Sequence, residues 1–243
     1  MQFIALTDKG KLRVKNEDYC AAKQTEGFCV LLLADGMGGA NSGEVASSKA
    51  IETVLEKLNP ALMKKLSLPD IPRTLKQIIK EANKLLFNLG SQDPLYSGMG
   101  TTLEIFIAKD DTAYIAHIGD SRVYKISSSG ELLRLTKDHS LVEYMIDSGE
   151  LTREEAVNHP QKNIITRALG TAADIEPDII SHPLSDGDVI LMCSDGLTNM
   201  VSEKDILDTV MNTESISDCA KKLVDMANDA GGADNISVIL ARN

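Results

Sequence analysis

The sequence contains few of the residue types from which many protein sites are built. It has no tryptophan, four histidines and four cysteines, and aromatic residues make up only 4% of the chain. No two histidines have the spacing of a zinc-hydrolase motif and no two cysteines form a Cys-x-x-Cys pair, which argues against a zinc site. Aliphatic side chains must therefore fill the core, and the cysteines are expected to be reduced thiols rather than a disulfide framework.

Long apolar runs and a surplus of positive charge are also missing. The longest apolar run, 28–34, is far shorter than the roughly 20 residues that cross a bilayer. The first residues lack the basic flank and apolar core of a signal peptide. The net charge of −11 disfavours binding to nucleic-acid phosphates or anionic lipids. We therefore expect a cytoplasmic protein that binds neither nucleic acid nor membrane.

The hydrophobic pattern groups strands with strands and helices with helices. A helix is predicted over 44–58 with Asn41 or Ser42 near its cap, and a longer one carries an apolar stripe from Leu75 to Leu89. Two more helices are predicted near the end, the first begun by Ser202 with Asp205 as a capping box, the second capped by Ser217 and ended by Gly231. Strands are predicted at 1–6, 27–34, 103–108, 112–117, 123–127, 132–135, 188–193 and 236–241.

The order of these segments predicts an α+β protein. The strands between 103 and 135 are expected to form a meander of antiparallel hairpins. The polar segment 138–166, with only short helical pieces, is interpreted as a surface flap. In the absence of repeats or linkers, a single domain covering 1–243 is predicted, with sheet packed on sheet and helices outside.

Aspartates occupy strand ends or adjoining turns at five places. One of them, Asp35, directly follows a buried run and precedes Gly36, Gly38 and Gly39, a turn that lets the backbone approach a ligand closely. Each such aspartate alone is typical of an ordinary turn. Together they suggest a site whose hard oxygen ligands would favour Mg²⁺ or Mn²⁺. The five are Asp18, Asp35, Asp120, Asp195 and Asp234.

Three other interpretations of these motifs are excluded. The chain has no EF-hand spacing. Gly38 and Gly43 have the spacing of a Walker loop, but Glu44 stands where its lysine would be. Ser121 is not a nucleophile elbow, because Val123 replaces the second glycine.

The ordered set of motifs resembles the metal-dependent Ser/Thr protein phosphatase family, the protein phosphatase 2C type, in its compact bacterial form. The resemblance covers essentially the whole chain. Its motifs are Thr7-Asp8-x-Gly10, Arg13-x-x-Asn16-Glu17-Asp18, Ala34-Asp35-Gly36-Met37-Gly38-Gly39, Gly100-Thr101-Thr102, Gly119-Asp120-Ser121-Arg122, Ser194-Asp195-Gly196 and Asp234-Asn235.

The resemblance implies a four-layer αββα sandwich, with two mainly antiparallel sheets flanked by helices and a variable flap at about 138–166. It also implies two Mn²⁺ or Mg²⁺ ions and a weaker third. Asp35 would bridge the first two ions and the Gly36 carbonyl would bind the second. Asp195 and Asp234 would complete the first, and Asp120 with Asp195 would hold the third. Glu17 and Asp18 would act through metal-bound waters, and Arg13 would bind the substrate phosphate.

The implied reaction is hydrolysis of phosphoserine and phosphothreonine monoesters by in-line attack of a metal-bridging hydroxide. Expected partners are phosphoproteins and a cognate bacterial Ser/Thr kinase, with the enzyme a monomer. Met37 stands where animal relatives carry a histidine proposed as general acid, so the leaving group must be protonated by another group. The alternatives are a phosphatase dedicated to one regulatory phosphoprotein of an anti-sigma pathway, and an inactive phosphoprotein-binding relative.

Overall fold

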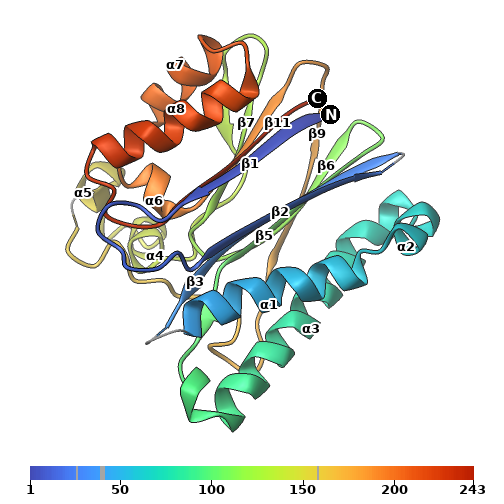
Figure 1. The fold of residues 1–243 in the computed structure, drawn as a ribbon, viewed down its shortest axis with the longest axis vertical. Helices are drawn as coiled ribbons and strands as arrows, with labels where there is room; N and C mark the ends of the chain where they lie inside the picture. The colour runs from blue at the N-terminus through green and yellow to red at the C-terminus, as the bar shows by residue number, and fades with distance from the viewer. Residues whose placement is uncertain (26, 39–41, 158) are drawn as a thin grey trace.

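A computed structural model describes residues 1–25, 27–38, 42–157 and 159–243. Two antiparallel β-sheets pack face to face, and helices cover the outer face of each sheet (Figure 1). The layer order helix, sheet, sheet, helix is the predicted αββα sandwich. Gly39 and Asn41, which the sequence predictions included, lie outside the described residues.

The first sheet has five strands in the order β1-β11-β10-β7-β8. Helices near the end of the chain cover it, as the upper layer of Figure 1 shows. Gln2 of β1 pairs with Arg242 of β11, which brings the two termini side by side. The elements are β1 (Gln2–Asp8), β7 (Arg122–Ile126), β8 (Leu132–Arg134), β10 (Val189–Cys193), β11 (Ile236–Arg242), α6 (Asp195–Thr198), α7 (Glu203–Met211) and α8 (Ile216–Asp229).

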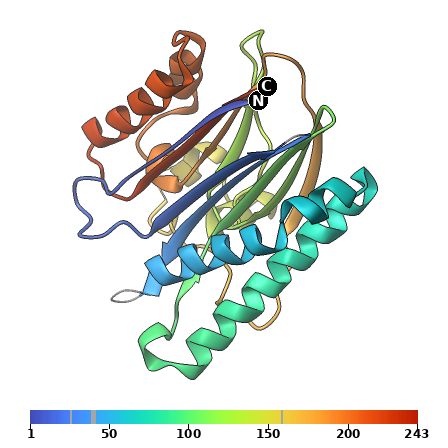
Figure 2. The same cartoon turned by 45° about the vertical axis from the view of Figure 1, so that its right-hand side comes forward.

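The second sheet follows the order β2-β3-β5-β6-β9, with the short strand β4 paired to β3. Helices α1 and α3 lie along its outer face, on the opposite side of the molecule from α7 and α8 (Figure 2). The elements are β2 (Asp18–Thr25), β3 (Phe28–Met37), β4 (Gly100–Thr101), β5 (Leu103–Lys109), β6 (Thr112–Ile118), β9 (Asp178–Pro183), α1 (Ser42–Lys57) and α3 (Ile71–Gln92). Shorter helices flank α3: α2 (Pro60–Lys65), the 3₁₀ turn η1 (Leu68–Asp70) and the 3₁₀ turn η2 (Pro94–Tyr96).

Burial on both faces explains why the central strands read as continuous apolar runs. In β3, Leu32 and Ala34 pack under α1 and α3, whereas Leu31 and Leu33 face the other sheet. Alternate residues of a strand point to opposite faces, so a sheet covered on both sides needs apolar residues at every position. The same alternation in β10 completes a core of three apolar layers.

The predicted meander over 103–135 is wrong. Strands β5 and β6 form one hairpin and β7 and β8 another, but the two hairpins belong to different sheets. The chain crosses between the sheets at 119–121, where Gly119 has a φ of +122° and lies so close to Thr102 that a Cβ would come within 2.5 Å of its side chain. Hydrophobic periodicity identifies strands but not the sheet to which each strand belongs.

Other local predictions have mixed outcomes. Ser202 does cap α7, since its hydroxyl accepts the Asp205 N–H. The predicted cap of α8 is wrong: Ser215, rather than Ser217, accepts the Asp218 N–H, because the helix begins at the buried Ile216. Strands β2 and β9 were not predicted, since their sequences mix polar and small residues.

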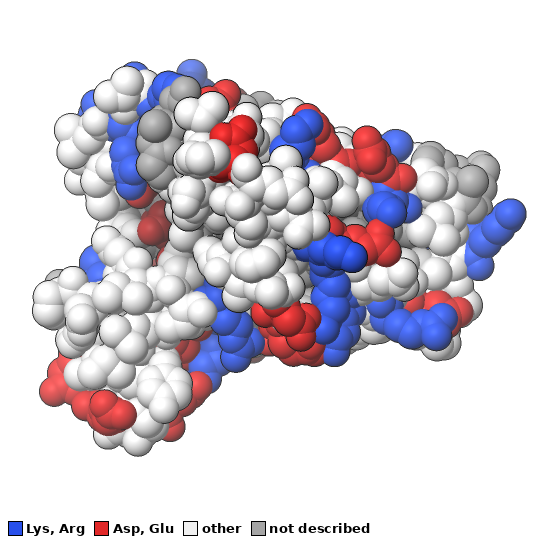
Figure 3. Space-filling model, turned by 90° about the horizontal axis from the view of Figure 1, so that it is seen from below, with Lys and Arg blue, Asp and Glu red and all other residues white. Residues whose placement is uncertain are grey.

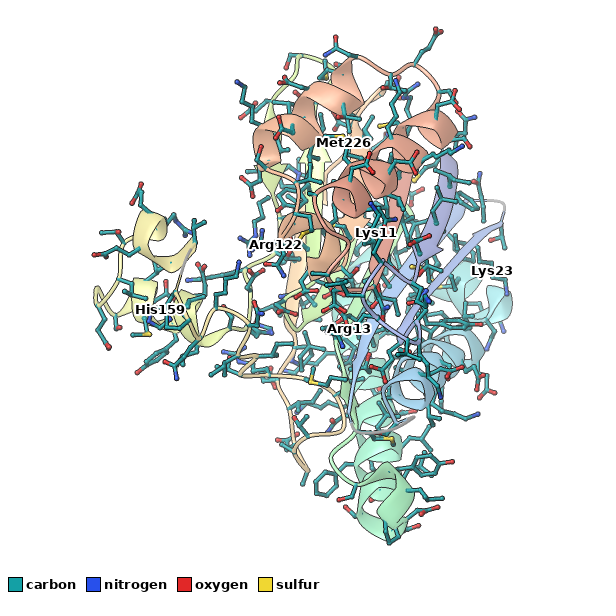
Figure 4. The ribbon with its side chains drawn as sticks, turned by 60° about the vertical axis from the view of Figure 1, so that its left-hand side comes forward. Lys11, Arg13, Lys23, Arg122, His159 and Met226 are labelled. Atoms are coloured by element: carbon teal, nitrogen blue, oxygen red, sulfur yellow. The ribbon has the colours of Figure 1, made fainter. Side chains whose placement is uncertain are left out.

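The segment 138–166 contains two short helices, α4 (Leu141–Asp147) and α5 (Arg153–Val157), as predicted for the flap. It projects to one side of the sandwich, and Figure 4 shows His159 on this projection. Its root is anchored, since His139 and Ser140 are buried.

All four cysteines are free, as expected, and three of them are buried. Among the described residues, no helix has both the length and the apolarity needed to traverse a lipid bilayer. Acidic and basic side chains are interspersed over the face shown in Figure 3.

Candidate metal centre

Asp18 and Asp35 meet because their strands pair. They are directly opposite each other in the β2–β3 register. Asp35 shares the alternation of Leu31 and Leu33, which face the five-stranded sheet, and Asp18 shares that of Cys20 in β2. Both carboxylates therefore lie at one end of the space between the two sheets. From the opposite sheet, the Ser194 hydroxyl donates a hydrogen bond of 2.8 Å to Asp18 Oδ2.

Asp195 and Asp234 lie at the same end of the space between the sheets, next to the neighbouring strands β10 and β11. Asp195 is the first residue of α6, immediately after β10, and Asp234 lies two residues before β11. The two turns touch at Gly196, where a Cβ would lie 2.0 Å from the Asn235 carbonyl oxygen. Asp120 arrives separately, in the crossing between β6 and β7.

Electrostatics shows that the five aspartates share one environment. Burial raises the pKa of Asp35 well above its usual range, and the charges of Asp18, Asp195, Asp120 and Asp234 raise it further. Burial is also the main cause that raises the pKa of Asp18 to about 6 and of Asp195 to about 6, and it raises that of Asp120 well above its usual range. The cluster thus binds protons unusually well, as expected where cations are needed to balance the charge.

Two buried carboxylate oxygens without hydrogen-bond partners in the described part of the chain indicate that this cluster suits a divalent cation. Among the described residues, Asp18 Oδ1 and Asp120 Oδ1 are buried without a hydrogen-bond partner. A buried carboxylate oxygen is costly unless something binds it, and an all-oxygen donor set suits Mg²⁺ or Mn²⁺. Within the described ranges, no three Asp, Glu, His or Cys side chains are packed tightly enough to enclose an ion by themselves. The carboxylates of this cluster suit a divalent cation, and which aspartate binds which ion stays a prediction.

Gly36 and Glu17 lie at the edge of this cluster. A Cβ on Gly36 would lie 2.2 Å from the Gly43 carbonyl oxygen and 2.6 Å from that of Glu17, so only glycine fits there. The Gly36 N–H donates to the Glu17 carbonyl at 3.1 Å. A Cβ on Gly43 would lie 2.5 Å from Glu17 Oε1 and 2.9 Å from Gly36 O, which shows that these two oxygens approach the same point.

Arg13 brings positive charge to the acidic cluster from the segment between β1 and β2. Its Nη2 donates a 2.6 Å hydrogen bond to Asp234 Oδ2, and half of its side chain is exposed. Figure 4 shows Arg13 near the middle of the molecule, apart from the flap. The predicted phosphate ligand is therefore placed beside the carboxylates.

Sequence reasoning missed the side chains that hold these elements in place. Asn235 Oδ1 accepts the Glu17 N–H at 2.8 Å, and its Nδ2 donates to the Lys9 and Lys15 carbonyls at 2.9 Å each. Thr102 Oγ1 accepts the Asp35 N–H at 2.9 Å. Both residues occur within the recognised motifs, but a motif alone does not show which backbone groups its side chains bind.

A cleft of about 330 Å³ separates the acidic cluster from the flap. Asp120 and Asp195 line one side, and Val142, Ile146 and Arg153 of the flap line another. The sandwich, the acidic end and the cleft beside it are together the arrangement implied for a metal-dependent phosphatase.

The chain belongs to the protein phosphatase 2C family, whose model matches residues 13–239. It is 40% identical over 249 residues to protein phosphatase PhpP of Streptococcus pneumoniae, a match that covers 99% of this chain and 96% of that protein. Among solved structures, the S. agalactiae serine/threonine phosphatase is 38% identical with a TM-score of 0.91, and the match covers 98% of both chains. The catalytic domain of the serine/threonine phosphatase PstP, in complex with 2 manganese ions, is 33% identical with a TM-score of 0.84, covering 99% of this chain and 97% of that one.

Proposed function

We propose that this protein is a Mn²⁺- or Mg²⁺-dependent protein serine/threonine phosphatase that hydrolyses phosphoserine and phosphothreonine monoesters. The observation that carries the proposal is the convergence of five aspartates at one end of a phosphatase 2C sandwich. Near full-length similarity to named bacterial phosphatases, and a relative solved with two manganese ions, support it.

Two ions would be held by Asp35 as a shared ligand, by Asp195 and Asp234 on one side, and by the Gly36 carbonyl on the other. Asp120 with Asp195 would hold a weaker third ion. When bound, the metals would activate water at neutral pH and stabilise the charge of an in-line displacement. Asp18 and Glu17 would accept hydrogen bonds from waters around the ions.

Arg13 would bind the phosphoryl group. Its guanidinium is planar and matches two phosphoryl oxygens at once. It pairs with Asp234 here, and a cation on Asp234 would weaken that pairing and leave Arg13 available to substrate. Because the thioether of Met37 holds no transferable proton, the leaving group would take its proton from another group.

The substrates would be phosphoproteins, with a cognate Ser/Thr kinase supplying them. We propose that the enzyme acts as a cytoplasmic monomer formed by a single domain over 1–243, with 138–166 as its flap. An inactive phosphoprotein-binding relative is not favoured, since every predicted metal aspartate is in place. A phosphatase dedicated to one anti-sigma-pathway protein is not favoured either, since the relatives are named protein phosphatase PhpP and serine/threonine phosphatase stp.

A metal-dependence assay tests the function. Purified protein should hydrolyse p-nitrophenyl phosphate and a phosphothreonyl peptide with Mn²⁺, lose the activity in EDTA and regain it on adding Mn²⁺. Hydrolysis that persists unchanged in EDTA would contradict the assignment.

Arg13→Ala tests the proposed phosphate ligand. It should raise KM for the phosphopeptide by about tenfold or more, because a bidentate charged contact is lost. Lys11→Ala is the matched control, since Lys11 is an exposed cation of the same segment that pairs with Asp229. An unchanged KM in Arg13→Ala would assign phosphate binding to another group.

A further inference from the structure

His139, at the root of the flap, forms two hydrogen bonds with the backbone of the turn that carries Asp120. The His139 N–H donates to the Gly119 carbonyl at 2.7 Å, and the Gly119 N–H donates back to His139 Nδ1 at 3.1 Å. Both polar groups of Gly119 are thus bound by one residue. Since Gly119 has a φ of +122° in the crossing between the sheets, this double contact determines the direction in which Asp120 leaves the turn.

The hydrogen bonds define which imidazole nitrogen carries the proton. Nδ1 accepts from Gly119, so in the neutral ring Nε2 carries the hydrogen. Its acceptor is Asp178 of β9, whose Oδ2 lies 3.3 Å away. Arg167 Nη1 also lies 3.2 Å from Nε2, and it donates to Asp178 Oδ1 at 3.4 Å, so one carboxylate accepts from both donors. Burial lowers the pKa of His139 to about 4, with a further contribution from His117, so the ring is neutral near pH 7.

A second buried histidine supports the His139 ring from one side. The ring centroids of His117 and His139 are 4.6 Å apart. His117 is itself held at both nitrogens, by Glu104 Oε1 at 2.9 Å and by the Lys137 carbonyl at 2.8 Å. His117 and Glu104 are fully buried, so His139 packs against a rigid surface.

We propose that His139 is a positioning residue, which sets the orientation of Asp120 and so couples the root of the flap to the metal centre. The inference rests on the proposed function only in taking Asp120 as a cation ligand. Asp120 Oδ1 is buried without a partner in the described part of the chain, so nothing within its own turn fixes this carboxylate oxygen. His139 acts through Gly119 and touches neither substrate nor metal.

The test compares Mn²⁺ binding isotherms and Gly119 amide exchange in a set of variants. His139→Phe keeps the ring packing but removes the acceptor, and His139→Asn restores an acceptor near the position of Nδ1. Asp120→Asn identifies the binding step that depends on Asp120. The control is His159→Phe: His159 is also a flap histidine whose Nδ1 accepts a backbone N–H, from Gln161 at 3.2 Å, but it lies on the projecting part of the flap (Figure 4).

We expect His139→Phe to weaken the Asp120-dependent step by about tenfold, the scale of lost ligand-supporting contacts. In the metal-free protein it should also speed exchange of the Gly119 amide. His139→Asn should recover most of both effects, and His159→Phe should match the wild type.

The inference would be overturned if His139→Phe bound Mn²⁺ as the wild type does. It would also be overturned if the Mn²⁺ isotherm of Asp120→Asn were the same as that of the wild type. If His139→Phe does not fold, Asp178→Ala decides, because it removes the half-exposed acceptor of Nε2–H and should weaken the same step. Wild-type binding by Asp178→Ala would then overturn the inference. Metal binding and amide exchange remain measurable even if no phosphoester is hydrolysed, so failure of the proposed function would be seen separately.

Discussion

Asp138 and the aspartate cluster lie beside one cleft, which Asp120, Asp138 and Asp195 line, and their charges are neutralised in different ways. Asp138 accepts hydrogen bonds from Arg122 Nε at 3.1 Å and Nη2 at 2.7 Å, and it pairs with Arg134 as well. Asp18 and Asp35, a short distance away, have other carboxylates as their main charged neighbours.

The difference indicates which group is complete without a ligand. Two arginines neutralise Asp138 within the fold, so its role is to join the flap root to β7 and β8. The aspartate cluster has Arg13 at its edge, paired to Asp234. Buried like charges raise the free energy of the folded protein unless cations bind. The cluster should therefore destabilise the metal-free protein and favour cation binding. Neutral substitutions at the two places should therefore have opposite effects on stability.

Asp35→Asn should have the largest effect, because Asp35 is the carboxylate that the other four aspartates surround. We expect phosphatase activity to fall by about a thousandfold or more, since two-metal activation of water would be lost. Mn²⁺ binding measured by calorimetry should fall in parallel. Asp229→Asn, at an exposed aspartate, is the control and should behave as the wild type. Retention of half the activity by Asp35→Asn would disprove the shared-ligand assignment.

Asp138→Asn should destabilise the protein by about 3 kcal/mol, because it leaves two guanidinium groups without their carboxylate. Urea unfolding with and without Mn²⁺ measures this loss, which should be similar in both conditions. Asp147→Asn is the control on the same flap, since Asp147 is exposed and its pair with Lys137 contributes little. Equal stabilities of the two variants would mean that Asp138 is not structurally needed.

Asp18→Asn should stabilise the metal-free protein near pH 7 by up to about 3 kcal/mol, since one pKa unit corresponds to about 1.4 kcal/mol. The sign follows from linkage: the pKa of Asp18 is raised from 3.8 to about 6, so ionisation is less favourable in the folded state. The penalty is present above about pH 6 and disappears as pH falls toward 3.8. Unfolding in EDTA tests this, and with Mn²⁺ the gain should shrink or reverse. A loss of stability in EDTA would contradict the comparison.

The pH dependence of Mn²⁺ affinity is the smallest expected effect. Protons and cations compete for Asp18 and Asp195, both with a pKa of about 6. Affinity should therefore fall by about tenfold for each of the two that must ionise, as the pH is lowered from about 7 to about 5. Calorimetric titrations at several pH values measure the slope. His139 has a pKa of about 4 and stays mostly neutral through this range. Affinity independent of pH would show that the cluster is already ionised.

Much of the fold could be predicted because strong local patterns define it. The stripe from Leu75 to Leu89 lies within α3, and the run before Asp35 forms β3. The errors came where local pattern does not decide the outcome. The 119–121 segment could equally have been a hairpin turn, and only the pairing of β6 and β7 with strands of different sheets shows that it crosses between them. Ser215 and Ser217 are both plausible caps, and burial of Ile216 decides between them.

The sequence by itself determined which residues are the candidates for the chemistry: the aspartates of the oxygen-rich motifs, in a chain with few histidines, and Arg13. These follow from residue type and order along the chain. The tertiary structure alone decided that the motifs meet, because strand register and sheet packing bring Asp18 opposite Asp35 and Ser194 across to Asp18. It also decided that Asp138 is neutralised while the cluster is not. Such charge balance depends on distances between residues far apart in the chain, which no local pattern records.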